Sequence, residues 1–432
     1  MSTAEHIVVG AGHEATRVAA TLIAAGHSVS LIRVGGQLPP ELACHGRASW
    51  RKMDGDQSLA NNVLGPTRAQ AKSTRGVLVS GSTHALPMSP LTFGRIVPNG
   101  HRRLAARSWL RARARNALAE VVGGGQEERT YRDWVVRRMG TPAYDILYAD
   151  YAERRWGRSG EDIAASTARV AHSPALATQR VVPADIRDHS ATRAEALVAA
   201  DGGRIIDVDT VRFRVDRRTL SCVEADDEAH LVGERLVWAV ASPADVAGWL
   251  GAACPPAAAH LASDLATVPS IRVRLSGASK SHPDEVHVLD AGPCWRLVRA
   301  PDDPDAWIVS STGAFSASVV EDIRDFAVQN GLVSADCTVV AAGAVPGGMP
   351  VWGPVAHARL RTVLDTYAAL GIRLSGSAGT LTALDPTSLV QHARLLLDAG
   401  SAELQEAWRV VAAPPTLVED LGARITHFFA DA

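Results

Sequence analysis

The chain has 432 residues, which is enough for two or three domains with sizeable cores. Its 44 Lys and Arg residues nearly balance 46 Asp and Glu residues, so the overall charge argues against nucleic acid and against a membrane as partners. The five cysteines are scattered without a CxxC pair, which argues against a disulfide framework or a metal site. No signal peptide or membrane-spanning run is recognisable, and we expect a cytoplasmic protein.

The N-terminal segment carries the most informative pattern. Residues 7–33 predict a strand, a glycine turn at Gly10 and Gly12, a helix and a second strand. In a dinucleotide-binding fold, the bare amide groups at such a helix N-terminus hold a pyrophosphate. Ala15 takes the third position of the glycine fingerprint, where a small residue is allowed because helix and strand pack closely. The pattern favours a dinucleotide-type fold, with a βαβ unit that binds no nucleotide as the alternative.

The residue at the end of the second strand departs from this pattern. An acid normally stands there, about 20 residues beyond the turn, and accepts hydrogen bonds from the ribose hydroxyls. This chain has Arg33 instead. An arginine at this place suits a ribose 2′-phosphate, or it indicates a pocket that has drifted away from cofactor use. The sequence leaves both interpretations open.

The elements beyond Arg33 are expected in the following order. A loop rich in glycine and proline begins at Gly35, and a polar stretch with little periodicity extends to about residue 75. A short strand pair at 77–79 and 96–97 precedes a section dominated by helical spacing at 100–180. Strands are expected at 205–208, 211–215, 236–240, 271–275, 294–298, 306–309 and 338–340, with a helix at 318–329. The C-terminal part predicts a helix at 355–369, a strand at 371–374, a glycine loop and a helix at 387–397.

Four segments spread through the chain form one ordered pattern. They are residues 148–157 (YADYAERRWG), 236–243 (LVWAVASP), 345–352 (VPGGMPVW) and 371–392. Together with the glycine turn, they resemble the flavin-dependent amine-oxidase-like enzymes, above all the branch with protoporphyrinogen oxidases and UDP-galactopyranose mutases. The matching family segments are PYxxKxWG, a VVxAxP strand, an aromatic-rich stretch and the closing motif. The resemblance covers most of the chain and is weakest between residues 35 and 75.

The resemblance implies an α/β fold. It predicts a Rossmann-like FAD/NAD(P)-binding domain of the GR2 flavoprotein type, with an inserted helical region and a second, mixed-sheet substrate domain. The FAD-binding domain is expected to comprise residues 1–80, 195–245 and 350–432. The helical insert then covers residues 85–190, and the substrate domain covers residues 250–348.

The resemblance also implies which residues hold FAD, the expected cofactor. They are Gly10, Gly12 and Ala15 for the pyrophosphate, Arg33 near the ribose, Val211 for the adenine, and Gly376, Gly379 and Asp385 for the ribityl chain and flavin ring. Asp385 before Pro386 is equally an ordinary helix N-cap.

Three features depart from the family pattern. Arg33 replaces the acid for the ribose, Ser377 replaces the arginine of the closing motif, and the GGR loop survives only as Gly35-Gly36-Gln37. An arginine can still pair with a phosphate, so Arg33 does not forbid a nucleotide.

Candidate substrate residues come from an arginine-rich section. Arg103, Arg107 and Arg111 share one helix face at i, i+4 spacing, where like charges repel unless an anion or nearby acids compensate them. Arg107 and Arg111 therefore either bind an anionic substrate or belong to a solvated face paired with acids. The acids available for such pairing are Glu120, Glu127, Glu128 and Asp133.

Aromatic residues and the glycine turn supply the remaining candidates. Trp352 is the expected wall of the active cavity, because its family counterpart lies near the flavin. Apolar patterns predict a core position for Trp134, Trp156, Trp238 and Trp295. His13 and Glu14, within the glycine turn, are expected to face solvent rather than a cofactor.

These observations predict an FAD-dependent oxidoreductase, or a mutase-like flavoenzyme, that acts on a small organic substrate in specialised biosynthesis. The arginines favour an anionic substrate. No nucleophilic triad is recognisable, which is compatible with flavin chemistry because the cofactor carries the reaction. The alternative is a flavin-free descendant that serves as a binding or scaffold partner of another protein, or as a non-redox isomerase or cyclase.

Overall fold

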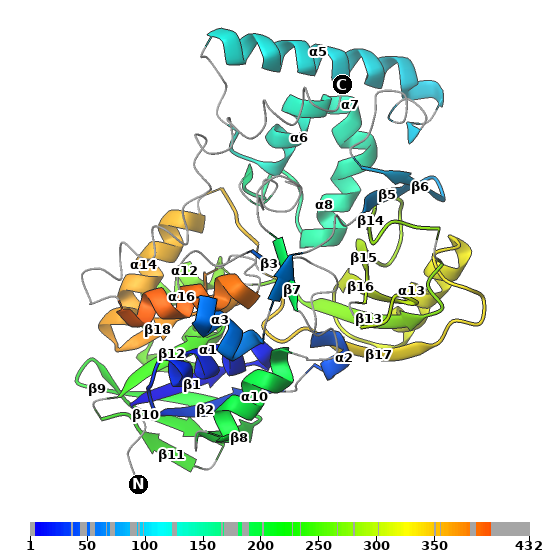
Figure 1. The fold of residues 1–432 in the computed structure, drawn as a ribbon. Coiled ribbons are helices and arrows are strands. Elements are labelled where there is room, and N and C mark those ends of the chain that lie inside the picture. The colour runs from blue at the N-terminus through cyan, green and yellow to red at the C-terminus, as the bar shows by residue number, and fades with distance from the viewer. Residues whose placement is uncertain are drawn as a thin grey trace.

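Figure 1 shows the fold of the chain in a computed structural model. The structure describes residues 5–35, 38–43, 50–51, 57–65, 67–69, 74–86, 93, 96–97, 99–122, 128–165, 167, 180–183, 190–200, 203–226, 228–233, 235–265, 267–279, 281–300, 302–349, 351–354, 356–380 and 386–398. These residues form a five-stranded sheet, a seven-stranded sheet, two three-stranded sheets and the surrounding helices. The expected α/β class is confirmed.

The glycine turn belongs to the five-stranded sheet, in which all strands are parallel. The strand order is β18–β12–β1–β2–β8. The strands are β1 (His6–Gly10), β2 (Val29–Val34), β8 (Arg204–Val208), β12 (Leu236–Val240) and β18 (Ile372–Leu374). β1 is buried along its whole length, as expected for a central parallel strand with both faces covered. The register places Gly10 between Val240 and Arg33 at the carboxyl edge of the sheet, where ligands bind in open α/β folds.

Helices and a small sheet surround the parallel sheet. α1 (Gly12–Ala24) packs against α3 (Gln57–Leu64), α10 (Ser190–Ala200) and α16 (Pro386–Asp398). α11 (Pro243–Leu250), α12 (Pro256–Ser263) and α14 (Ala356–Ala369) pack in sequence beside β18, with a 3-10 turn at Gly251–Ala253. β9 (Val211–Asp216), β10 (Thr219–Ala225) and β11 (Glu228–Leu231) form an antiparallel sheet that contacts α11.

The second large sheet is mixed, with the order β17–β13–β16–β15–β14–β5–β6. Its strands are β5 (Arg75–Val79), β6 (Ser82–Ala85), β13 (Ser270–Ser276), β14 (Glu285–Val288), β15 (Arg296–Arg299), β16 (Ala306–Thr312) and β17 (Val339–Ala344). The pair β5–β14 is parallel, and the other neighbours are antiparallel. α13 (Ala317–Gln329) packs on this sheet. β5 thus pairs here, although the sequence grouped residues up to 80 with the FAD-binding part.

The expected strand pair at 77–79 and 96–97 is wrong. β5 pairs instead with β6 through a two-residue turn at Ser80 and Gly81, whose φ angles are 52° and 68°. Two positive φ angles fit the turn type that closes right-twisted hairpins, so the nearer segment is the favoured partner. Ile96 is helical and buried, and its apolar character reflects core packing rather than a strand.

The helical region lies at one end of the molecule, with α5 outermost (Figure 1). It contains α5 (Arg102–Val122), α6 (Tyr131–Met139), α7 (Thr141–Ala143) and α8 (Ala149–Trp156), with a 3-10 turn at Asn99–His101 and a π-helical turn at Tyr144–Tyr148. Thr130 and Asp133 form a capping box that begins α6. Tyr131, Tyr151 and Trp156 form a buried aromatic core within this helical region.

The polar stretch after residue 35 contains short elements despite its weak periodicity. α2 (Pro40–Ala43) precedes β3 (Trp50–Arg51), and β4 (Thr67–Ala69) follows α3. β3 and β4 both pair with β7 (Arg180–Pro183). At the other end of the chain, α15 (Gly376–Thr380) follows β18. Within the described residues, every helix is too short or too polar to cross a membrane.

Candidate functional site

The turn after β1 leaves the N-terminus of α1 open. Ala11 stands at the N-cap position, and no side chain there accepts a hydrogen bond from the first amide groups of the helix. Gly12 has a φ of 65°, in the left-handed region that favours glycine. At Gly10, a Cβ would lie 2.4 Å from the carbonyl oxygen of Val240, so only glycine fits. Amide groups without a side-chain cap and a helix dipole together make this N-terminus an anion-binding position.

The closing segment lies directly beside this turn. The carboxylate of Glu14 accepts one hydrogen bond from the Ser377 N–H, at 2.7 Å, and another from the Ser377 hydroxyl, at 2.6 Å. Gly376 has a φ of 83°, and a Cβ there would lie 2.8 Å from Oε2 of Glu14. Segments more than 360 residues apart therefore meet at one carboxylate.

Two other expected cofactor residues lie in the same region. Ala15 is completely buried on α1, as the fingerprint requires where helix and sheet pack closely. Gly379 in α15 is buried, and a Cβ there would lie 3.1 Å from the carbonyl oxygen of Ala241. The structure thus brings the glycine turn and the closing segment together around the end of β12.

The loop at 345–348 covers the turn from a third side. A Cβ on Gly12 would lie 3.3 Å from the ring carbons of Pro346. A Cβ on Gly347 would lie 3.5 Å from Cβ of Ala378. This loop therefore contacts both the start of α1 and α15. The sequence placed this segment near the flavin by resemblance but gave no signal that Pro346 lies against Gly12.

Arg33 lies at the expected strand end, and its guanidinium is hydrogen-bonded to two acidic side chains. Its guanidinium donates two hydrogen bonds to Asp207, at 2.6 and 2.7 Å, and one to Glu195 at 2.7 Å. These hydrogen bonds to Asp207, more than the opposing effect of burial, raise the pKa of Arg33. The arginine is therefore committed to protein carboxylates, which argues against its use for a ribose 2′-phosphate.

The remaining cofactor candidates fall elsewhere. Val211 opens β9, where it is buried and stands opposite Ala225 of β10. Gly35 donates its N–H to the Val208 carbonyl oxygen at 2.9 Å. Asp385 lies outside the described residues, as do residues 36 and 37 of the expected loop.

The expectation that His13 and Glu14 face solvent is wrong. Glu14 is half-buried and points to Ser377. His13 is half-buried too, and its Nε2 lies buried without a hydrogen bond in the described structure. Burial, assisted by the charge of Arg17, lowers the pKa of His13 to about 4. Sequence alone could not show that Leu38 and Arg272, both distant in the sequence, contribute to the surroundings of His13.

The arginine-rich face of α5 is solvent-exposed. Arg103, Arg107 and Arg111 are all exposed, and none has an ion pair with a described residue. Two of the acids expected to compensate them have other partners: Glu128 binds Arg138 at 2.7 Å, and Asp133 caps α6. A second partner of Glu128, Arg137, lies 3.5 Å away. Residue 127 lies outside the described residues.

The tryptophans largely follow expectation. Trp156, Trp238 and Trp295 are buried, while Trp134 is half-buried under the guanidinium of Arg138. Trp352 is half-buried against the core of the parallel-sheet unit, and its carbonyl oxygen accepts the Ala164 N–H at 2.6 Å.

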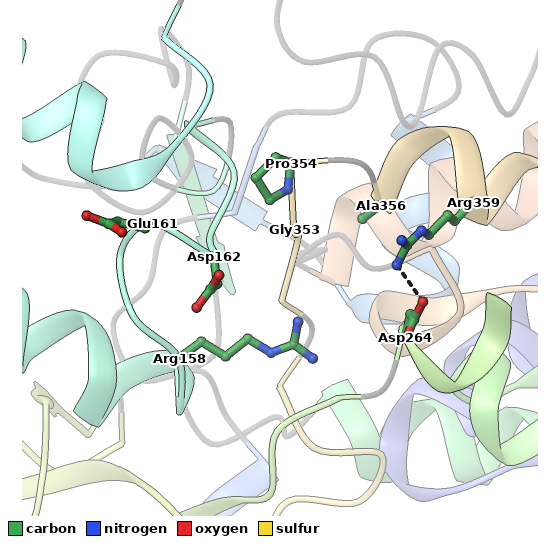
Figure 2. A pocket seen from close by; sticks show the side chains of 8 residues that line it. All are labelled: Arg158, Glu161, Asp162, Asp264, Gly353, Pro354, Ala356 and Arg359. Carbon is green, nitrogen blue, oxygen red and sulfur yellow. Dashed lines mark hydrogen bonds and ion pairs between the residues drawn. The ribbon is translucent and has the colours of Figure 1, made fainter. Parts of the chain in front are cut away.

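An open pocket of about 390 Å³ is lined in part by Gly353 and Pro354, the two residues that follow Trp352 in the chain (Figure 2). It is lined by Arg158, Glu161, Asp162, Asp264, Gly353, Pro354, Ala356 and Arg359. Arg359 forms an ion pair with Asp264, whereas Arg158 has no ion pair among the described residues. In Figure 2 the guanidinium of Arg158 points into the space between Asp162 and the Asp264–Arg359 pair. The pocket thus carries two arginines and three acids, and Arg158 is the arginine that forms no ion pair with a described residue; guanidinium groups bind carboxylates and phosphates.

A buried polar network joins α8 to the mixed sheet, and sequence patterns did not predict it. The Tyr151 hydroxyl lies 2.9 Å from Nδ1 of His287, and Nε2 of His287 lies 3.2 Å from Glu285. Arg155 donates to the Tyr151 hydroxyl at 2.7 Å. Arg154, in the segment that resembled PYxxKxWG, donates to three carbonyl groups of the sheet region, including that of Cys294 at 2.9 Å. None of these residues lines the pocket, so the network positions α8.

The charge balance of this network rests on Glu285. Burial raises the pKa of this carboxyl group, but Arg296 at 2.8 Å, His287 and Arg75 at 3.0 Å outweigh it and hold the pKa well below its usual range. Burial also lowers the pKa of His287. A buried acid is thus kept ionised between two arginines.

Glu5, His6 and His27 gather at the opposite edge of the sheet, with potential metal ligands within 4.8 Å of one another. The Trp238 indole N–H donates to Nδ1 of His6 at 3.2 Å, so neutral His6 carries its proton on Nε2. That nitrogen then has no lone pair for a metal. Burial lowers the pKa of His6 to about 4, which keeps this tautomer neutral.

Several solved structures share this fold. Reduced UDP-galactopyranose mutase superposes with a TM-score of 0.71 at 12% identity, over 96% of this chain and 97% of that chain. A protein from Exiguobacterium sp. 255-15 described as a protoporphyrinogen oxidase gives a TM-score of 0.63 at 14% identity, covering 94% and 100%. Cyclohexylamine oxidase from Brevibacterium oxydans IH-35A gives 0.61 at 14% identity, covering 95% and 99%. The chain has the fold of these enzymes. No family model matches it, and no curated protein matches it in sequence.

FAD, which the resemblance implies for this fold, can be compared with the residues present. The backbone fits, because the uncapped start of α1 and the positive φ of Gly12 offer amide donors at the sheet edge. Two side chains fit less well. Glu14 adds a negative charge beside the same helix terminus, and Arg33 is held by two acids. The site therefore fits a pyrophosphate on condition that Glu14 moves away from Ser377.

Proposed function

We propose that the chain is an FAD-dependent enzyme, of the oxidoreductase or mutase type, that acts on a small organic substrate. The observation that carries this proposal is the open N-terminus of α1 at Gly12, which lies at the carboxyl edge of the parallel sheet and beside α15. An uncapped helix start at this place is the anion site of dinucleotide folds. The shared fold with flavin-type oxidases and a mutase supports the same proposal.

The cofactor contacts follow from position in the fold. The amides after Gly10 and Gly12 would hold the pyrophosphate, and the backbone at Val211 would meet the adenine. Gly376 and Gly379 would approach the flavin end, with Asp385 as the further candidate. When bound, FAD would supply the redox or covalent chemistry, while the protein binds and orients the substrate.

The substrate proposal rests on the pocket that Arg158 and Asp162 line. Arg158 points into a volume of about 390 Å³, which suits a small molecule rather than a polymer. Its guanidinium would bind a carboxylate or phosphate group of the substrate. Asp162, which lines the same pocket, would accept hydrogen bonds from another part of the ligand. A small organic molecule that carries an anionic group for Arg158 is therefore the proposed substrate class.

The absorbance spectrum of the freshly purified protein tests this proposal. Flavin bands, with stoichiometric FAD released on denaturation and identified by chromatography, are the expected result. A colourless protein that stays colourless after incubation with FAD and gel filtration would overturn it. The flavin-free binding or isomerase alternative would then be the remaining one.

A further inference from the structure

Glu14 occupies an unusual place for an acid in a proposed nucleotide site. It lies in the first turn of α1, the turn whose amide groups would receive the pyrophosphate. Its carboxylate accepts two hydrogen bonds, from the N–H and the hydroxyl of Ser377 at the start of α15. An amide N–H and a hydroxyl are the same donors that phosphate oxygens use in proteins. The carboxylate thus occupies two donors of the kind that bind an anion.

The surroundings hold this carboxylate in place. A Cβ on Gly376 would lie 2.8 Å from Oε2 of Glu14 and 2.7 Å from Cγ1 of Val240, so the absence of a side chain at Gly376 makes room for the acid. Pro346 closes the other side of the turn by its contact with Gly12. The segments at Gly376 and at Pro346 therefore flank the start of α1.

The negative charge of Glu14 would oppose the binding of a nucleotide at this place. A pyrophosphate at the start of α1 would bring negative charge next to the Glu14 carboxylate, and neighbouring like charges repel strongly where water is partly excluded. Glu14 forms no ion pair with a described residue, and its carboxylate accepts hydrogen bonds only from the N–H and the hydroxyl of Ser377 there.

We propose that the Glu14 carboxylate is an internal competitor of the cofactor pyrophosphate: FAD binds when this side chain leaves Ser377, and the contact sets the affinity. The inference rests on the proposed FAD site and deepens it by naming the residue that limits binding. Neutralising Glu14 should tighten FAD binding, whereas neutralising an exposed acid elsewhere should not. The same change should weaken the cofactor-free protein, because it loses a charged acceptor for two hydrogen bonds.

The test is a fluorescence-quenching titration of FAD into cofactor-free protein, with the thermal midpoint measured before FAD is added. The variants are Glu14→Gln and, as a matched control, Glu153→Gln, an exposed acid on α8. We expect Glu14→Gln to lower the dissociation constant by about tenfold or more and to lower the thermal midpoint. Glu153→Gln should change neither quantity.

A second variant covers the case in which Glu14→Gln folds poorly. Ser377→Ala removes one of the two donors, and we expect FAD binding to tighten by about threefold. Equal FAD affinities for wild type, Glu14→Gln and Ser377→Ala would overturn the competition and leave the proposed function standing. Absence of FAD binding in all of them would instead overturn the proposed function.

Discussion

Arg33 and Asp207 lie at paired positions on neighbouring parallel strands, and the Arg33 guanidinium donates two hydrogen bonds, of 2.6 and 2.7 Å, to the Asp207 carboxylate. Glu195 from α10 accepts a third hydrogen bond from the same guanidinium. The edge position where a ribose-binding acid is expected therefore holds one cation and two acids. The acids come from other elements, and the arginine is the group that holds them together.

This arrangement predicts the effect of restoring an acid. Arg33→Glu would place three carboxylates together, so we expect a loss of about 1–3 kcal/mol in unfolding free energy and no gain in FAD affinity. Chemical denaturation of Arg33→Met, Asp207→Asn and the double variant would give the coupling energy of the pair, expected at about 1 kcal/mol because Asp207 is exposed. An increase in FAD affinity on Arg33→Glu would contradict this account.

The free energy of unfolding should fall as the pH drops from about 6.5 to 4, because three histidines resist protonation in the folded chain. Burial lowers the pKa values of His6, His13 and His392 to about 4 in the folded chain, whereas unfolded histidine titrates near 6.5. The unfolded chain therefore binds more protons between these values, and stability is lost as the pH falls from about 6.5 to 4.

The variant His392→Gln isolates one of these protons. Denaturation at pH 7, 6 and 5 should show a smaller pH dependence than in wild type, by up to about 1.4 kcal/mol per pH unit. His260→Gln, an exposed position on α12, serves as the control and should keep the wild-type slope. An unchanged slope in His392→Gln would show that this histidine already takes up its proton in the folded chain.

The Glu285 network should dominate the attachment of α8 to the mixed sheet. Glu285→Gln removes the anion between Arg296 and Arg75, so we expect a loss of about 3–5 kcal/mol in unfolding free energy. Tyr151→Phe removes one hydroxyl and should cost about 1–3 kcal/mol. Urea denaturation measures both, and a smaller effect for Glu285→Gln than for Tyr151→Phe would contradict the charge assignment.

Arg158 should be the arginine that binds small anions. A thermal-shift titration with inorganic phosphate should stabilise wild type and should lose this effect in Arg158→Ala. Arg107→Ala with Arg111→Ala tests the other expected substrate residues, which lie on the exposed face of α5. If the double variant loses the phosphate response and Arg158→Ala keeps it, the substrate proposal moves from the pocket to α5.

Local features of this fold were predictable from the sequence. The βαβ unit follows from an apolar run, two glycines and helical spacing, each of which acts within a few residues. α5, α13, α14 and α16 were likewise expected from periodicity. The strand at 96–97 was wrong because an apolar run has no period of its own, and a positive-φ turn at Ser80 selected the nearer partner.

The chemistry of the site depends on contacts between distant residues. Glu14 meets Ser377 across 363 positions, and Arg33 meets Asp207 across 174. A single polar residue in a loop or at a strand end belongs to no periodic pattern, so the sequence does not predict its partner. The acids expected to compensate Arg107 and Arg111 illustrate the same point, since Glu128 forms an ion pair with Arg138 instead.

The FAD site at Gly12 is tested most directly by an FAD titration of wild type and Gly12→Ala, followed by flavin fluorescence. We expect saturable one-to-one binding by wild type. Gly12→Ala should bind at least about tenfold more weakly, because the left-handed backbone and Pro346, 3.3 Å from the added methyl group, would disturb the turn proposed to receive the pyrophosphate. Absence of saturable binding by wild type, or equal binding by a folded Gly12→Ala variant, would overturn this site.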